Sequence, residues 1–371
     1  MKAEANYQTE EVADVMASPV AIAEDDTTAR LTRIWQELLG VEPIEADQNY
    51  FDLGGDSILA VQLFAHIQKV FQIKLPVATL FEAPTIEELA RILRRETAPA
   101  SGWSPLVAIQ PSGSRPAFFC VHGAGGNVLI YRDLSRHLGS DQPFYGLQSQ
   151  GLDRSCPPLS KIENMAALYV KEIQRVRPHG PYFLGGYCGG GTIAFDVAQQ
   201  LQAQGEQIAL LALFDTSNWS TIHPPSILDR SYYACQKFVF QAANFFSLDS
   251  DGRAKFFWEK VEGMQLARLG KGSRTAVSES RVLRQIRRAN DRACWDYVPK
   301  PYSGVVTDFR PVKQYRMFNK PNAKWDRLAR AEEVVVLPVY PAGMLVEPFV
   351  KHLAVALKKS IDGVICGCAT S

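Results

Sequence analysis

The segment FLGGYCGGGTIAF, residues 183–195, constrains the fold more than any other part of the chain. Its first apolar residues predict a buried strand, and its last ones recur at the spacing of a helix. The glycines between them, Gly186, Gly189 and Gly190, permit a sharp turn that lifts Cys188 above the end of the strand. A strand, a tight turn and a helix in this order predict an α/β sheet with a thiol at its edge.

Further strands are predicted on both sides of this segment, at AFFCVHG, IALLALFD and VVVLPVY, with helices such as TIAFDVAQQLQAQG between them. Strands that alternate with helices predict a parallel sheet covered on both faces. Residues 222–300 interrupt this alternation, because they are helical in pattern, aromatic and basic. We expect a helical lid over the C-terminal edge of the sheet here, with a simple packing subdomain as the alternative.

A separate helical region precedes the sheet. Residues 1–25 are polar and acidic and predict a disordered leader, whereas residues 26–96 carry apolar residues at helical spacing. The last of these helices opens with a capping box, Thr85 and Glu88. This pattern predicts a four-helix bundle, followed by an Ala/Pro/Ser-rich linker at 97–104 and the α/β domain at 105–371.

Composition excludes several classes of protein. The net charge is +1, which gives no basis for binding nucleic acid or a membrane surface. No apolar run approaches the ~20 residues that span a bilayer. The seven cysteines are scattered and include no C-x-x-C pair, which is typical of a cytoplasmic protein with reduced thiols. We expect no disulfide framework and no metal site.

The first candidate site is Ser57, in the segment DQNYFDLGGDSILAVQLF. It opens a predicted helix directly after Gly54, Gly55 and Asp56. The two glycines allow a sharp turn that exposes the hydroxyl, and the N-terminus of a helix suits a phosphate group. Ser57 is therefore placed to carry a phosphodiester, although a simple N-cap is the alternative for such a serine.

The second candidate site is built around Cys188, which we expect to be a nucleophile with a lowered pKa at its helix N-terminus. A small buried apolar residue is the alternative for a free cysteine. The upstream turn VHGAGG presents backbone amides, so the amides of Ala124 and Gly189 are the candidates for an oxyanion hole. His122, in the same turn, is expected to be structural. Asp215 ends a strand 27 residues after Cys188, where an acid orients a catalytic base.

Both sites resemble parts of known families. The stretch 27–96, with YFDLGGDSI and LFEAPTIEELA, resembles the carrier domain of modular synthetases. The stretch 105–362 resembles the thioesterase domain that ends nonribosomal peptide and polyketide synthases, an α/β-hydrolase; it contains VHGAGG, GYCGGG, LFDTSN and AKWDRLA…MLVEP. The resemblance implies 4'-phosphopantetheine attached to Ser57 by a phosphopantetheinyl transferase, upstream synthase modules, and an acyl or peptidyl thioester as substrate.

The chain departs from this family at the catalytic histidine. The family carries it in a P-G-x-H-x-x-M-L-x-E-P type of segment, whereas this chain reads LPVYPAGMLVEPF and has Pro341 at the matching position. None of the six histidines fits the motif. His352 and His223 stay open as substitutes that reach the site by rearrangement.

Cysteine in place of serine, together with the missing histidine, changes the expected chemistry. A thiolate of low pKa attacks a thioester without a general base, but attack by water on the acyl-enzyme still needs one. We therefore expect transfer to an amine, or another condensation or cyclisation, rather than simple hydrolysis, with Asp215 binding the incoming ammonium or accepting its proton. Two alternatives stay open: hydrolysis with a relocated histidine, and a degenerate domain that only binds or gates the acyl-carrier.

One more motif is the basic stretch RVLRQIRR, residues 281–288, within the expected lid. It is suited to the phosphate of the arm or to the acidic surface of the carrier. A solvated helix face is the alternative.

Overall fold

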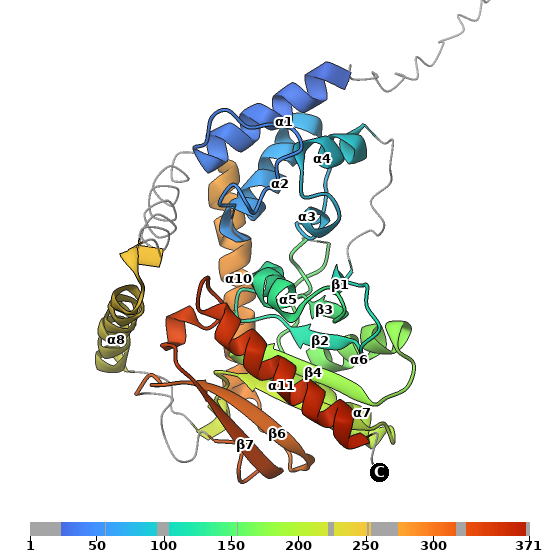
Figure 1. Ribbon diagram of the computed structural model, residues 1–371, viewed down its shortest axis with the longest axis vertical. Coiled ribbons are helices and arrows are strands. Elements are labelled where there is room, and N and C mark those ends of the chain that lie inside the picture. Colours follow the sequence, from blue (N-terminus) through green and yellow to red (C-terminus); the bar gives the residue numbers. More distant parts are fainter. Residues whose placement is uncertain are drawn as a thin grey trace, which may run out of the picture.

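The computed structural model describes residues 24–55, 57–94, 104–153, 155–221, 226–250, 252–253, 274–316 and 324–368. Residues 1–23 of the expected leader, residues 97–103 of the expected linker, and His223 lie outside them. The described residues form an N-terminal helical region, 24–94, and an α/β region, 104–368 (Figure 1). The predicted fold class is confirmed.

The helical region contains four helices, α1 (Glu24–Leu39), α2 (Ser57–Phe71), α3 (Thr79–Glu82) and α4 (Ile86–Leu93). The apolar residues of the periodic pattern form its core, which includes the fully buried Leu31, Trp35, Leu63 and Leu89. The predicted capping box begins α4. The Thr85 hydroxyl accepts from the Glu88 amide at 3.2 Å, and the Glu88 carboxylate accepts from the Thr85 amide at 3.2 Å.

The α/β region is built on one seven-stranded sheet in the order β1-β3-β2-β4-β5-β6-β7. The strands are β1 (Leu106–Gln110), β2 (Phe118–Val121), β3 (Phe144–Leu147), β4 (Tyr182–Tyr187), β5 (Ile208–Phe214), β6 (Tyr302–Pro311) and β7 (Ala329–Leu337). Neighbouring strands are parallel except for β1 and β3, which are antiparallel. The carboxyl ends of β2, β4 and β5 therefore share one edge of the sheet.

Helices cover both faces of the sheet, as the strand and helix alternation predicts. On one face α5 (Arg132–Leu138) and α11 (Val350–Cys368) pack over Phe118, Phe183 and Phe214. On the other face α6 (Ile162–Val176) and α7 (Gly189–Ala203) pack over Val121, Leu184 and Leu213. Figure 1 shows α11, in red, running across the sheet. Among the described residues, no helix combines the length and the apolar character needed to cross a bilayer.

The described part of the expected lid is helical. It contains α8 (Ile227–Ser247) and α10 (Arg274–Asp296), and no strand lies among the described residues of 222–300. The side chain of Ile286 on α10 lies against the turn at Gly126, and the Asn290 amide donates to the Ala124 carbonyl at 3.1 Å. The other end of α10 runs beside α2 in the helical region (Figure 1).

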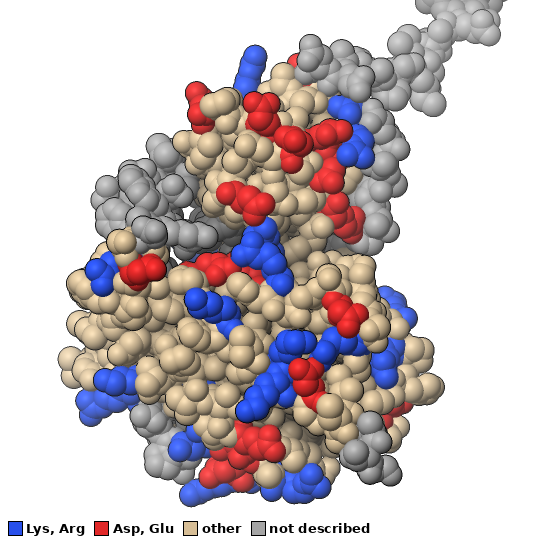
Figure 2. All heavy atoms as spheres, viewed as in Figure 1, with Lys and Arg blue, Asp and Glu red and all other residues tan. Residues whose placement is uncertain are grey.

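The two regions touch through the turn that precedes α2. The guanidinium of Arg132, at the start of α5, lies 3.2 Å from the Asp52 carboxylate and 4.3 Å from the ring centre of Phe51. Leu129 packs into the core of the helical region, and Lys74 donates to the Asp153 carbonyl. Figure 2 shows mainly acidic side chains on the visible face of the helical region, and both acidic and basic side chains at its border with the α/β region.

Candidate active site

Cys188 lies in a strained turn between β4 and α7. Its φ of 55° is in the left-handed region, and its backbone is fixed from both sides. The Cys188 amide donates to the Phe214 carbonyl at 2.9 Å, and the Cys188 carbonyl accepts from the Gly191 amide at 3.1 Å. This is the strand–turn–helix arrangement of a nucleophile elbow, which raises the side chain above the edge of the sheet.

The glycines around Cys188 are required by close backbone approach. A Cβ at Gly190 would lie 2.1 Å from the His122 carbonyl oxygen, and one at Gly186 would lie 2.4 Å from the carbonyl group of Gly190. A Cβ at Gly191 would lie 2.0 Å from the Thr216 hydroxyl. The run GGYCGGG therefore packs α7 tightly against the ends of β2, β4 and β5, which places the turn at the centre of the sheet edge.

Substituting Gly190→Ala is expected to lower the free energy of unfolding by about 3 kcal/mol or more, because the new methyl group meets a backbone carbonyl that has no room to move. The matched control is Gly363→Ala in α11, where no heavy atom lies within 4 Å of the added Cβ. That change is expected to raise the free energy of unfolding by roughly 0.5–1 kcal/mol, the propensity difference in a helix. Urea unfolding of both variants measures the contrast; equal effects would contradict the tight elbow.

Asp215 follows the end of β5 and also has a left-handed backbone, with φ of 45°. Its amide donates to the Phe309 carbonyl at 2.9 Å, which fixes the turn. Burial raises the pKa of its carboxyl from 3.8 to about 6, against the lowering effect of a hydrogen bond from Gln314 and of the Arg310 charge. Asp215 is therefore a carboxylate at neutral pH with more basic character than an ordinary aspartate.

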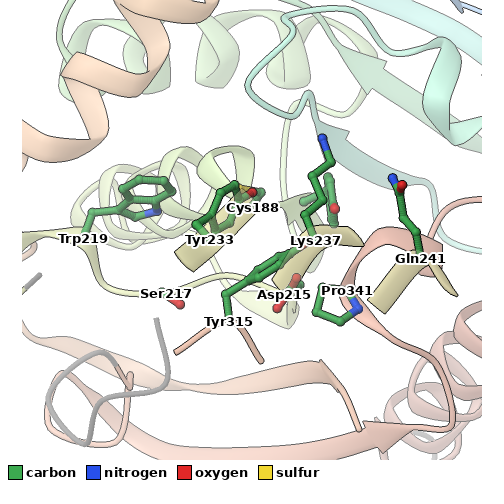
Figure 3. Close-up of a pocket in the computed structure, with 10 residues that line it drawn as sticks. Cys188, Asp215, Ser217, Trp219, Tyr233, Lys237, Gln241, Tyr315 and Pro341 are labelled. Carbon is green, nitrogen blue, oxygen red and sulfur yellow. The ribbon is translucent and has the colours of Figure 1, made fainter. Parts of the chain in front are cut away.

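One cavity of about 290 Å³ brings Cys188 and Asp215 together, as the sequence predicts for the two side chains. Figure 3 shows the surrounding side chains, three of which extend from α8. The described residues of the lining are Tyr187, Cys188, Asp215, Ser217, Trp219, Tyr233, Lys237, Gln241, Tyr315 and Pro341. The position that the family resemblance assigns to the histidine, Pro341, thus lies in the wall of this cavity.

Two α8 residues of the cavity, Lys237 and Gln241, were not predicted from the sequence. Tyr233, Lys237 and Gln241 recur every fourth residue, so they share one face of the helix. Tyr315 packs against Tyr233 with ring centres 4.5 Å apart and closes the same side. The recurrence of Tyr233, Lys237 and Gln241 at every fourth residue was the sequence signal available for this face.

The predicted low pKa of the Cys188 thiol is wrong. Burial, and next the negative charge of Asp215, raise its pKa to about 12, and the hydrogen bond from the Gly189 amide lowers it by less. A helix N-terminus stabilises a thiolate only when the sulfur keeps enough contact with solvent or with cations. At neutral pH this sulfur therefore carries its proton.

The two predicted oxyanion amides belong to the turns that meet at the elbow. The amide of Gly189 donates toward the Cys188 sulfur. Ala124 lies in the turn after β2, next to Gly123, whose Cβ would lie 3.2 Å from the Tyr187 ring. The role of both amides stays a prediction.

None of the described histidines lines the cavity of Cys188. His122 is buried, with its ring nitrogens 2.6 Å from the Gly123 carbonyl and 2.9 Å from the Tyr169 hydroxyl, and burial lowers its pKa to about 4. It is a structural group, as expected.

His352, a proposed substitute, lines a different cavity of about 560 Å³ with Ser247 and Phe349. Each of the remaining described histidines has a hydrogen-bond partner elsewhere: His66 with the Gln62 carbonyl, His137 with the Glu347 carboxylate and His179 with the Glu206 carboxylate.

The turn before Ser57 fits an attachment site. Ser57 is the first residue of α2, a helix of 15 residues, and Gly54 has a φ of 92° that few other residues adopt. A Cβ at Gly55 would lie 2.3 Å from the Tyr50 ring, so the chain passes close to the core at this point. The amides at the start of α2 suit a phosphate group.

Comparison with known proteins identifies both regions. Residues 29–93 match the phosphopantetheine attachment site family, and residues 116–226 match the thioesterase domain family. Malpinin synthetase of Mortierella alpina is 43% identical over 196 residues, 52% of this chain and 2% of that protein. A dimodular nonribosomal peptide synthase of Bacillus subtilis is 40% identical over 185 residues, 50% of this chain and 8% of that protein.

A solved structure resembles nearly the whole chain. The holo form of AB3403, a four-domain nonribosomal peptide synthetase bound to AMP and glycine, aligns with a TM-score of 0.58 and 25% identity, over 96% of this chain and 27% of that one. The chain thus spans a small part of the length of these relatives. Its carrier domain indicates a covalently attached 4'-phosphopantetheine. The chain contains a phosphopantetheine carrier domain followed by a thioesterase domain, and both resemble those of nonribosomal peptide synthetases.

Proposed function

We propose that this didomain releases an acyl or peptidyl chain from a phosphopantetheine arm on Ser57 through an acyl-enzyme at Cys188. One observation carries the proposal: a cysteine in a nucleophile elbow shares a cavity with a carboxylate directly downstream of a carrier domain. The arm supplies the acyl group as a thioester. Exchange of one thioester for another is nearly neutral in energy, so the chain's own groups need only move one proton.

Asp215 takes the role of proton acceptor in this proposal. The Cys188 sulfur bonds to the carbonyl carbon while its proton passes to the Asp215 carboxylate, and the leaving thiolate recovers that proton. The pKa values of about 12 and about 6 mean that a free thiolate does not accumulate, so proton transfer accompanies attack. The amides of Ala124 and Gly189 stabilise the oxyanion.

Release favours an amine over water. Water must lose a proton during attack and gains about 10²–10⁴-fold from a positioned base. Among the described residues of this cavity no imidazole is present, so water depends on the Asp215 carboxylate as its base, whereas an amine attacks without one. An amine is already a good nucleophile, and Asp215 binds its ammonium form or accepts its proton. We therefore expect the acyl group to be transferred to a separate amine, or to cyclise onto an amine of the substrate itself.

The acyl-enzyme is expected to partition toward aminolysis. With Cys188 acylated from a short-chain thioester, millimolar primary amine is expected to give amide as the main product, because an amine is a stronger nucleophile than water. Product ratios measured by liquid chromatography and mass spectrometry check this. The Cys188→Ala variant controls for direct reaction of amine with the donor thioester. Free acid as the main product at every amine concentration would overturn the aminolysis step.

A second candidate is a domain that binds or gates the acyl-carrier without catalysis. The high pKa of Cys188 favours it, since such a sulfur is a weak nucleophile without a proton acceptor. Release that proceeds unchanged in the Cys188→Ala variant would support this candidate. The remaining alternative, hydrolysis with a relocated histidine, has no support from His352, and His223 lies outside the described residues.

A further inference from the structure

Helix α10 connects the carrier to the elbow. Part of it packs beside α2, the helix that begins with Ser57, and Cys294 near its other end packs against the elbow (Figure 1). The Cys294 sulfur lies 3.8 Å from the Gly189 carbonyl, one residue from Cys188. The turn before Ser57 faces the thioesterase domain through Asp52 and Arg132. Helix α10 therefore contacts both the helix that begins with the attachment point and the elbow that holds the nucleophile.

One side of α10 carries a stripe of charged residues and meets the elbow at its Cys294 end. Arg284, Arg287, Asp291 and Cys294 are spaced by three or four residues and share one side of the helix. Arg287 lies 3.9 Å from Asp291. After burial and Asp215, the charge of Asp291 raises the pKa of Cys188 and that of Arg287 lowers it, so both side chains are within electrostatic reach of the sulfur.

The length of the stripe matches the length of the arm. Arg284 and Cys294 are ten positions apart, which is ~15 Å along a helix. About twelve bonds separate the phosphate of pantetheine from its sulfur, equivalent to about four residues of extended chain or ~14 Å. A phosphate beside Arg284 thus allows the terminal sulfur to reach the level of Cys188.

We propose that Arg284 and Arg287 form a binding site for the phosphodiester of the phosphopantetheine arm and hold the arm along α10 during transfer. Guanidinium groups bind phosphate oxygens in a bidentate fashion. Asp291 repels the phosphate from the half of the stripe nearest the elbow, so the phosphate lies on the Arg284 side of Arg287. The site selects for the arm independently of its cargo.

A spin-labelled arm tests this site. The full apo-chain is modified at Ser57 with a coenzyme A analogue whose thiol carries a nitroxide, and electron paramagnetic resonance measures the immobilised fraction of the label. Wild-type chain is expected to show a large immobilised fraction. The double variant R284Q/R287Q is expected to lower the ratio of immobilised to mobile label about five-fold or more, the loss of about one exposed ion pair at the upper end of its range.

The matched control is R292Q on the same helix. Arg292 is exposed, pairs with Asp296 at 3.4 Å, and points ~140° away from Arg287 at 100° per residue. Its neutralisation is expected to leave the label unchanged, whereas 0.5 M salt on wild-type chain is expected to release the label, since exposed pairs are screened. The ³¹P resonance of the phosphodiester is expected to shift between wild type and the double variant, and circular dichroism checks folding.

Three results would overturn the site: a mobile label in wild-type chain, an unchanged label in the folded double variant, or equal release in R292Q. The probe carries no thioester. Its behaviour therefore does not depend on acyl transfer to Cys188, and failure of this site and failure of the proposed function are separate outcomes.

Discussion

Cys188→Ala is expected to remove acyl-enzyme formation and to slow release of a carrier-bound acyl group by about 10³-fold or more, because the group that bonds to the carbonyl carbon is lost. Cys188→Ser is expected to be nearly as inactive. Its hydroxyl needs a strong general base, and no described histidine lines the cavity. Single-turnover release from the loaded arm, followed by mass spectrometry, measures both variants.

Cys156→Ala is the matched control for these two variants, since Cys156 is an exposed thiol that does not line the cavity. It is expected to release product at the wild-type rate. Substantial activity of the serine variant would point to a base that the described residues do not include, in favour of hydrolysis with a relocated histidine.

Asp215→Asn is expected to slow acyl transfer to Cys188 by about 10²–10⁴-fold, the usual contribution of a positioned base. The wild-type rate is expected to fall as pH decreases through about 6, because the carboxylate becomes protonated there. The variant is expected to lose this inflection. Stopped-flow measurement of acyl transfer from a chromogenic thioester, between pH 5 and 8, checks both results.

The free energy of unfolding of Asp215→Asn distinguishes a loss of catalysis from a loss of folding. Folding raises the pKa of Asp215 from 3.8 to about 6, so the folded state loses stability relative to the unfolded state as pH rises from about 4 to about 6. The neutral Asn lacks this loss and is expected to be at least as stable as wild type at pH 8. Asp326→Asn, an exposed aspartate outside the cavity, is expected to change neither rate nor stability. A variant that keeps the wild-type rate would exclude Asp215 as the proton acceptor.

The local patterns of the sequence were sufficient to predict most of the fold. The apolar runs of β2, β4 and β5 are long enough to be recognised, and the glycines of the elbow leave one possible turn between β4 and α7. β1 and β3 were not predicted, because β1 is a partly exposed edge strand and the four residues of β3 include Gly146, so neither forms an unbroken apolar run. Their pairing depends on contacts between segments that are far apart in sequence, which short patterns do not report.

The sequence was sufficient to predict two main residues of the candidate site, but not the pKa of its thiol. The spacing of Cys188 and Asp215 along alternating strands was enough to bring them to one edge of the sheet. The pKa of the thiol was predicted in the wrong direction, because it depends on burial by α8 and α10 and on the distance to the Asp215 carboxylate. Lys237 and Gln241 on α8 were missed for a similar reason, since the orientation of this helix is set by tertiary packing.

The central claim is that the sulfur of Cys188 receives the cargo. Its most direct measurement loads the arm on Ser57 with an acyl group, quenches the chain in acid within seconds, and locates the acyl group by peptide mass spectrometry. We predict acyl mass on the peptide that contains Cys188 in wild-type chain, and less of it in Asp215→Asn. Acyl mass that stays on the arm of a folded, fully loaded wild-type chain, and never on Cys188, would contradict the account.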